Sequence, residues 1–316
     1  MENRSQMILT EVKKVIVGKD EVLKEVLMAL LAGGHVLLED VPGVGKTQLA
    51  LSFSKAMGLS YGRVQFTPDT MASDITGFSV YDRNTGEFTY HKGAIFCNCF
   101  LGDEINRTSA KTQAALLQAM EELQVTVDGK TYPLPDPFFC IATQNPLGSA
   151  GTHSLPDSQL DRFMVRLSMG YPTKQDTLRI VRERENALPL ESVDSVVSAE
   201  ELKWMKKAVS EVYISDDVVL YATDLCEKTR ASEDVEQGVS PRAVLALVQM
   251  AKAAAFVEGR DYVVPNDIAA LFPDVCGHRV ILNPKARIRK VTPQEVLTGM
   301  VKEVKMPSPS SVKAKA

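Results

Sequence analysis

The sequence predicts an α/β protein in which a mostly parallel sheet is followed by a smaller, all-helical domain, and three observations lead to this prediction. Short apolar segments alternate with helical segments over residues 1 to about 172, a glycine-rich loop joins the first apolar segment to a helix, and the pattern beyond about residue 198 is helical. Alternating strands and helices are typical of a parallel sheet with helices on both faces. Such sheets bind ligands at the carboxyl ends of their strands.

Five apolar segments are the candidate strands of the sheet. They span residues 36–39, 62–66, 98–103, 138–143 and 163–168.

Two further segments, at about 77–92 and 124–135, interrupt the alternation of strands and helices. The first alternates apolar and polar residues around Asn84-Thr85-Gly86, and the second does so around Asp128-Gly129. Both segments predict β-hairpins, because a period of two on each side of a tight turn indicates two paired strands.

The second half of the chain predicts helices after a polar linker. Ser198 to Glu201 forms a capping box, Asp216 to Thr229 has apolar residues at helical spacing, Ser240-Pro241 starts another helix and Thr292 to Glu295 caps the last one. We therefore expect four regions along the chain, which are an α/β core at 1–185, a linker at 186–198, an all-α domain at 199–305 and a disordered tail at 306–316.

The loop Asp40-Val41-Pro42-Gly43-Val44-Gly45-Lys46-Thr47 follows the first strand and opens the amphipathic segment Gln48 to Met57. Backbone N–H groups of such a loop, backed by the helix dipole, form a cradle for phosphate. Lys46 would reach the β- and γ-phosphates of a nucleotide, and Thr47 would offer its hydroxyl to Mg²⁺. An ordinary Gly/Pro turn would not explain the Lys-Thr pair. Asp40 replaces the first glycine of the general pattern, which gives the start of the loop less conformational freedom.

A second phosphate-side motif follows about 55 residues later, where the apolar run from Ala94 to Gly102 ends in Asp103-Glu104. An acid at that strand end would hold Mg²⁺ together with Thr47, so Thr47 and Asp103 are the candidate metal ligands. Glu104 is placed to orient and polarise the attacking water. An isolated acid pair after an apolar run is usually a solvated strand end, but the upstream phosphate loop favours the catalytic interpretation.

Two later polar residues each allow two interpretations. Asn145 follows the strand at 138–143 and would hold a water molecule or the γ-phosphate; taken alone, the Gln-Asn-Pro sequence favours a simple turn. Arg162 ends a short helix that begins near Pro156. It would form a surface ion pair with Asp161 or Asp157, or act as an arginine finger in the ATP site of a neighbouring subunit.

Composition excludes several classes of protein. The 316 residues suggest about two domains, the net charge is −4, and no basic run indicates a nucleic-acid surface. No apolar stretch approaches the ~18 residues of a membrane span, and the first residues lack the apolar core of a signal peptide, so we expect a cytoplasmic protein. Five scattered cysteines without a second ligand pair predict buried, reduced thiols and no zinc site.

With these motifs in order, the chain resembles the MoxR family of AAA+ ATPases over roughly residues 8–300. The segments that carry the resemblance are Val17-Gly18-Lys19, Leu38 to Thr47, Gln65 to Asp69, Asp103 to Arg107, Gln113 to Glu122, Ala142 to Pro146, Leu160 to Phe163 and Ser240 to Ala243.

The resemblance implies a P-loop AAA+ parallel-sheet sandwich followed by a small all-α lid domain. It also implies an ATPase that forms a homo-oligomeric ring, usually a hexamer with ATP between subunits. A chaperone-like role is expected, which remodels, assembles or activates protein clients alongside a partner with a von Willebrand factor A domain.

The resemblance completes the candidate sites. The nucleotide-binding set becomes Val17, Gly18, Pro42, Gly43, Val44, Gly45, Lys46, Thr47 and Gln48. Arg242 falls in the first turn of the helix that starts at Ser240-Pro241, where a cation is unfavourable unless an anion is near, so a phosphate sensor is favoured over a surface arginine. With Glu104, Asn145 and Arg162, it makes up the catalytic set. The two hairpins resemble the helix-2 insert and pre-sensor hairpin of one clade and would meet a client through Tyr81, Arg83, Phe88, Tyr90 and Lys130.

Three other functions compete with this interpretation. Thr173-Lys174-Gln175-Asp176 matches a guanine-reading pattern, but the same residues read as an ordinary helix cap. A DNA translocase would share both hairpins, although the acidic balance and the single lysine of the second hairpin count against it. A module that senses ATP without hydrolysing it would lack Glu104 or Arg162, and both are present.

Overall fold

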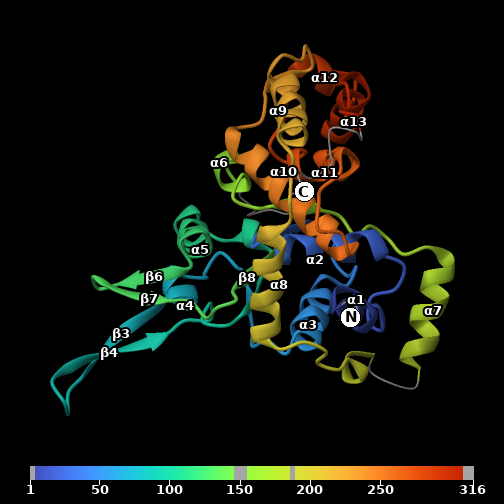
Figure 1. The fold of residues 1–316 in the computed structure, drawn as a ribbon. Coiled ribbons are helices and arrows are strands. Elements are labelled where there is room, and N and C mark those ends of the chain that lie inside the picture. Colours follow the sequence, from blue (N-terminus) through green and yellow to red (C-terminus); the bar gives the residue numbers. More distant parts are fainter. Residues whose placement is uncertain (1–3, 146–154, 186–188, 309–316) are drawn as a thin grey trace. The chain divides into compact units, whose positions relative to one another are not determined.

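A computed structural model of the chain describes residues 4–145, 155–185 and 189–308 (Figure 1). The described residues form two compact units. The first takes its residues from 1–26, 35–162 and 167–203, and the second from 27–34, 163–166 and 204–316. Three elements contribute residues to both units: α2 (Asp20–Leu31), β9 (Val165–Leu167) and α8 (Ala199–Glu211).

A five-stranded sheet with the order β2-β5-β8-β1-β9 is the centre of the first unit. Strand β5 pairs in parallel with β2 and with β8, and β8 pairs in parallel with β1. The strands other than β9 are β1 (Val36–Glu39), β2 (Tyr61–Gln65), β5 (Cys99–Asp103) and β8 (Phe139–Gln144). β5 and β8 are buried along their whole length, as expected of parallel strands that are covered on both faces.

The register aligns the carboxyl ends of four strands at one edge of the sheet. Gln65 lies opposite Asp103, and Glu39 lies opposite Gln144. Polar side chains that are distant in sequence are therefore brought together, while Phe53, Phe66 and Phe100 are fully buried in the core below.

The helices of the first unit mostly connect successive strands. They are α1 (Arg4–Lys13), α3 (Lys46–Ala56), α4 (Ala72–Thr76), the 3₁₀ helix η1 (Ile105–Arg107), α5 (Ala110–Glu122), α6 (Asp157–Leu160), α7 (Lys174–Arg184) and the 3₁₀ helix η2 (Pro189–Ser192).

Two antiparallel hairpins extend from the first unit, and both predicted hairpins are confirmed. One pairs β3 (Gly77–Asp82) with β4 (Glu87–Lys92), and the other pairs β6 (Gln124–Val127) with β7 (Lys130–Pro133). Asp128 and Gly129 both have positive φ angles, 51° and 75°, as a two-residue type I′ hairpin turn requires.

The second unit is helical, as predicted for the lid. Beyond the shared helices it contains α9 (Asp216–Arg230), α10 (Pro241–Val257), α11 (Pro265–Cys276), α12 (Pro284–Ile288) and α13 (Pro293–Glu303). A short antiparallel ribbon, β10 (Val235–Gln237) with β11 (Ile281–Leu282), adds a feature that the all-helical expectation did not include.

Buried side chains tie the segment at 163–166 to the helices of the second unit. The guanidinium of Arg279 donates to the carbonyl oxygens of Phe163 (2.7 Å) and Met164 (3.2 Å), and His278 Nε2 donates to Phe163 O (3.1 Å). Burial, followed by the charges of Arg279 and Arg166, lowers the pKa of His278 well below its usual value. A neutral ring there satisfies the carbonyl without burying a second positive charge.

The structure bears out most local expectations. The predicted caps are present at Ser198 and Thr292, and α9 and α10 begin where their patterns predicted. All five cysteines are buried free thiols. The proposed boundaries of core, linker and lid stay a prediction. Residues 186–188 of the linker and 309–316 of the tail lie outside the described residues.

Candidate functional site

The phosphate loop connects β1 to α3. Gly43 and Gly45 have φ angles of +87° and +100°, a region in which side chains other than glycine are strained. Gly45 is the N-cap of α3 and no side chain caps this end. The first turn, which contains Lys46, Thr47 and Gln48, therefore presents N–H groups without a side-chain acceptor, as an anion-binding helix start requires.

Lys46 is buried at the base of this loop, with 9% of the residue exposed. Its ammonium donates to the carbonyl oxygens of Asp40 (2.6 Å) and Val41 (3.3 Å). Burial lowers the pKa of Lys46, while the carboxylates of Asp40, Asp103 and Glu104 act in the opposite direction. The loop thus holds one desolvated cation within the field of three acids.

Asp40, which replaces the usual first glycine, is buried and serves as an acceptor. Its carboxylate accepts hydrogen bonds from the backbone N–H groups of Met169 and Gly170 and from the hydroxyl of Ser168. Its own φ angle is not positive, so a residue with a side chain fits there without strain. The sequence could not indicate this role, because the partners lie about 130 residues away.

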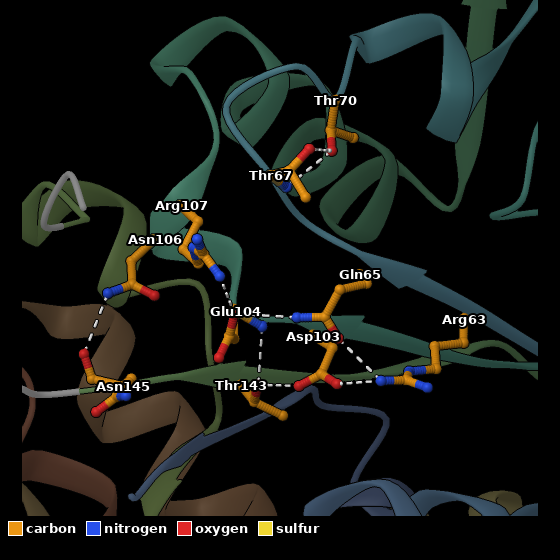
Figure 2. A network of polar contacts seen from close by, with 10 residues as sticks. All are labelled: Arg63, Gln65, Thr67, Thr70, Asp103, Glu104, Asn106, Arg107, Thr143 and Asn145. Atoms are coloured by element: carbon orange, nitrogen blue, oxygen red, sulfur yellow. Dashed lines mark hydrogen bonds and ion pairs between the residues drawn. The ribbon is translucent and has the colours of Figure 1, made fainter. Parts of the chain in front are cut away.

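Asp103 ends β5 and is 8% exposed. The hydroxyl of Thr143, at the end of the neighbouring strand β8, donates to Asp103 Oδ1 (2.6 Å) and accepts from the backbone N–H of Glu104 (2.9 Å). Arg63 Nη2 lies 2.8 Å from the other carboxylate oxygen, Oδ2 (Figure 2). Thr143 therefore holds the side chain of Asp103 and the backbone of Glu104, and Arg63 forms an ion pair with Asp103.

Glu104 has a left-handed backbone, with φ 58° and ψ 50°. Its Oε2 accepts from Gln65 Nε2 at 3.0 Å and from Arg107 Nη1 at 3.0 Å (Figure 2). Gln65 Oε1 in turn accepts from Arg63 at 2.9 Å. A non-glycine residue in this backbone region costs on the order of 1 kcal/mol, and such outliers are frequent at functional sites.

Four residues of this network were not predicted as site residues, namely Arg63, Gln65, Arg107 and Thr143. For Arg63 and Gln65 a signal exists in the sequence, because residues two apart on a strand project from the same face and β2 precedes the acid strand. Thr143 and Arg107 stand inside motifs used for the family resemblance, but their contacts to the acids follow from strand order.

Asn145 follows β8 beside the acid loop. Its backbone carbonyl accepts from Asn106 Nδ2 at 3.2 Å (Figure 2). Pro146, which completes the predicted Asn-Pro turn, lies outside the described residues.

The two candidate arginines lie in different units. Arg162 follows α6, and its Nη1 lies 3.0 Å from Glu121 Oε2 of α5. Glu121 is a partner that the sequence did not suggest, since α5 is distant in sequence from Arg162. Arg242 lies in the first turn of α10, in the second unit.

Ile16, which precedes Val17 and Gly18, lies beside the phosphate loop, since a Cβ on Gly45 would lie 3.8 Å from its Cδ1. Gly18 has φ +71°, where other residues are strained, and a Cβ there would lie 2.4 Å from the carboxyl group of Asp176, which would have to move. Asp176 and Thr173 form a reciprocal capping box at the start of α7. The Thr-Lys-Gln-Asp sequence is thus a helix cap, as its competing interpretation predicted.

Comparisons with known proteins agree with this geometry. Residues 35–165 match the ATPase family associated with various cellular activities (AAA), and residues 227–299 match the AAA lid domain. The uncharacterised protein YeaC of Bacillus subtilis is 45% identical over 296 residues, which cover 94% of this chain and 92% of YeaC. Chaperone MoxR1 of Mycobacterium tuberculosis is 37% identical over 311 residues, covering 96% and 82% of the two chains.

The chain belongs to the MoxR family of AAA+ ATPases. A solved structure of a candidate ATPase from Cytophaga hutchinsonii is also similar, with a TM-score of 0.88, 35% identity and coverage of 97% of this chain and 96% of that one. As a MoxR-type AAA+ ATPase, the protein binds nucleotide and hydrolyses ATP. Its fold, a parallel sheet with a helical lid, is the one predicted.

The described residues contain no helix that has both the length and the apolar character needed to cross a membrane.

Proposed function

We propose that this MoxR-type ATPase is a chaperone that uses ATP hydrolysis to remodel, assemble or activate a protein client that contacts its β3–β4 hairpin. The observation that carries the proposal is a pair of exposed aromatic side chains that do not belong to the phosphate loop or the acid pair. Tyr81 and Phe88 lie directly opposite one another on β3 and β4, with ring centroids 5.3 Å apart, and are 52% and 71% exposed. Phe78 (51%) and Val80 (42%) are exposed on the opposite face of the same ribbon, because successive strand residues project to opposite faces. Exposed apolar patches mark interaction sites in proteins.

The charge of both hairpins favours polypeptide over nucleic acid. In residues 77–92, Asp82 and Glu87 balance Arg83 and Lys92, and in residues 124–135 Asp128 balances Lys130. A groove that follows a nucleic-acid strand combines stacking aromatics with several basic contacts. These hairpins supply the aromatics without the surplus of positive charge, which makes the DNA translocase the weaker alternative.

ATP turnover is assigned to the residues at the strand ends. Lys46 would bind the β- and γ-phosphates, and the first turn of α3 would bind phosphate oxygens through N–H groups that no side chain caps. Thr47 and Asp103 would hold Mg²⁺, which, when bound, neutralises charge on the phosphates. One carboxylate and one hydroxyl suit this ion, since Mg²⁺ is usually held by one or two carboxylates with substrate phosphates.

Glu104 would orient and polarise the attacking water, and Asn145 would hold that water or the γ-phosphate. Val17 and Gly18 would border the nucleotide, with Pro42 and Val44 shaping the loop. We further propose a ring, most simply a hexamer, in which Arg162 reaches the site of the next subunit and Arg242 senses phosphate.

The chaperone would act together with a partner that contains a von Willebrand factor A domain. The hairpins would correspond to the helix-2 insert and pre-sensor hairpin of their clade. The name of the relative Chaperone MoxR1 supports the remodelling role.

One experiment separates the two partner classes. The Tyr81→Ala/Phe88→Ala protein and the parent are assayed for ATPase stimulation by a cellular protein fraction and by DNA across a salt series. We expect protein to stimulate the parent but not the variant, while the basal ATPase of both stays equal, because neither side chain contacts the nucleotide residues. Strong, salt-sensitive stimulation by DNA with none by protein would overturn the chaperone assignment.

A further inference from the structure

Tyr90 lies on the same hairpin as the exposed aromatic pair but in a different environment. Its ring stacks on Tyr132 of β7, with centroids 4.1 Å apart and planes at 18°. Its hydroxyl donates to the carbonyl of Thr76, and its ring meets the edge of Phe96 at 6.0 Å. Both tyrosines are half-buried, and burial, followed by the neighbouring Tyr132, raises the pKa of Tyr90. Tyr90 is therefore held by contacts within the first unit, whereas Tyr81 and Phe88 are exposed, and its contact with a client stays a prediction.

The β3–β4 hairpin is not part of the five-stranded sheet. Within the described residues its two strands pair with one another and form a sheet of their own. Its base is a close crossing at Gly77 and Gly93, where a Cβ on Gly77 would lie 2.3 Å from His91 O and one on Gly93 would lie 2.2 Å from Ile75 O. An isolated two-stranded ribbon is only marginally stable, so side-chain contacts near its base should determine its position on the unit.

The β6–β7 hairpin, by contrast, is inserted between two elements of the nucleotide site. It follows α5, which is separated by two residues from the 3₁₀ turn that ends at Arg107, and it precedes β8, which contains Thr143 and ends at Gln144. The backbone N–H of Leu134 closes its base on Leu123 O at 2.9 Å. β7 leads into β8, whose Thr143 bonds both acids, so a change at the acid pair has a covalent route to this hairpin. Figure 1 shows the two hairpins extending side by side from the first unit.

We propose that the Tyr90–Tyr132 stack is a joint that makes the β3–β4 hairpin follow the β6–β7 hairpin when the nucleotide state changes. Tyr90 and Tyr132 are then positioning residues, while Tyr81 and Phe88 at the outer part of the ribbon contact the client. The inference rests on the proposed function for its purpose, but the joint itself is testable without any client.

Hydrogen exchange of the full-length protein in the Glu104→Gln background, with ATP and then with ADP, tests the joint. We expect residues 77–92 and 124–133 both to change protection between the two nucleotides. Tyr132→Ala should abolish the nucleotide-dependent difference at 77–92, leave it at 124–133, and speed exchange at 77–92 by about three- to tenfold, the loss expected for one aromatic pair. Tyr132→Phe, which can still stack, should restore the coupled response.

The matched control is Tyr81→Ala, which removes an aromatic side chain from the same ribbon without touching the joint and should preserve the coupled response. The proposal is overturned if the difference at 77–92 survives Tyr132→Ala, or if residues 77–92 show no nucleotide-dependent change in the parent. Because no client is present, failure of this test is separate from failure of the chaperone assignment, which the stimulation assay decides.

Discussion

The carboxylate of Asp40 lies 3.2 Å from the backbone nitrogen of Gly170, which it bonds together with the N–H of Met169 and the hydroxyl of Ser168. The first residue of the phosphate loop is thereby fastened to the segment that leads from β9 to α7. That segment also contacts the Val17–Gly18 loop, since Lys19 donates to Tyr171 O at 3.0 Å. Asp40 thus joins the phosphate loop to the segment after β9, and Lys19 joins the same segment to the Val17–Gly18 loop.

Replacing Asp40 by glycine restores the common form of the loop and should nevertheless lower both the stability of the protein and its affinity for nucleotide. Asp40→Gly and Asp40→Ala remove the acceptor of one buried and one partly buried N–H group, and each should lower the free energy of unfolding by about 1.5–3 kcal/mol and weaken nucleotide binding. Denaturant unfolding and nucleotide titration check this. Asp194→Ala, which removes a carboxylate that is 82% exposed, is the control and should change stability by less than about 0.5 kcal/mol. A glycine variant that matches the parent in both measurements would contradict the assigned role.

Gln65 should restrain Glu104 in the resting state. Glu104 would have to leave its two donors to meet the attacking water, and removing the exposed hydrogen bond from the uncharged Gln65 amide lowers that cost by about 1 kcal/mol. Gln65→Ala should therefore raise basal turnover by up to about fivefold. Gln118→Ala, which removes an exposed glutamine that bonds Glu122, is the control and should have no effect. A tenfold loss in Gln65→Ala would mean instead that Gln65 positions Glu104 for catalysis.

Arg162 should act between subunits. Arg162→Ala should bind ATP normally yet lose turnover by about 10²-fold or more, because the transition state loses a cation that the neighbour supplies. Glu121→Ala breaks the same 3.0 Å ion pair but keeps the arginine, so it should retain activity. Mixing Arg162→Ala with Lys46→Ala subunits should restore part of the activity at shared interfaces. Turnover per subunit that is constant from dilute monomer to assembled ring would exclude the shared site. If activity depends on assembly but survives Arg162→Ala, Arg166, four residues further along the chain, is the second candidate for this role.

Much of the fold followed from local pattern. Apolar runs bounded by polar residues located the strands, and Asp128-Gly129 specified a hairpin turn because both positions need positive φ. The ribbon of β10 with β11 was missed because its strands are only three and two residues long, too short for any period to be recognised.

The site residues that are consecutive in the sequence were predictable, and the contacts between distant residues were not. Two pairs of consecutive residues form recognisable motifs: Lys46 with Thr47, and Asp103 with Glu104. The contacts of Asp40 with Gly170 and of Gln65 with Glu104 depend on which strands are neighbours, and the sequence does not fix that order. For the same reason Tyr90 looked like its exposed neighbours, since its partner Tyr132 lies on the other hairpin.

The most direct test of the account is the steady-state ATPase rate of Glu104→Gln, measured beside its nucleotide affinity. Glutamine keeps the size of the side chain and an acceptor for Gln65 and Arg107, but it cannot take a proton from water. We predict that the variant binds ATP as the parent does and turns it over about 10²-fold more slowly or worse, while Lys46→Ala loses affinity instead. A Glu104→Gln protein that hydrolyses ATP at the parent rate would contradict the assignment of the acid pair and with it the mechanism proposed for this site.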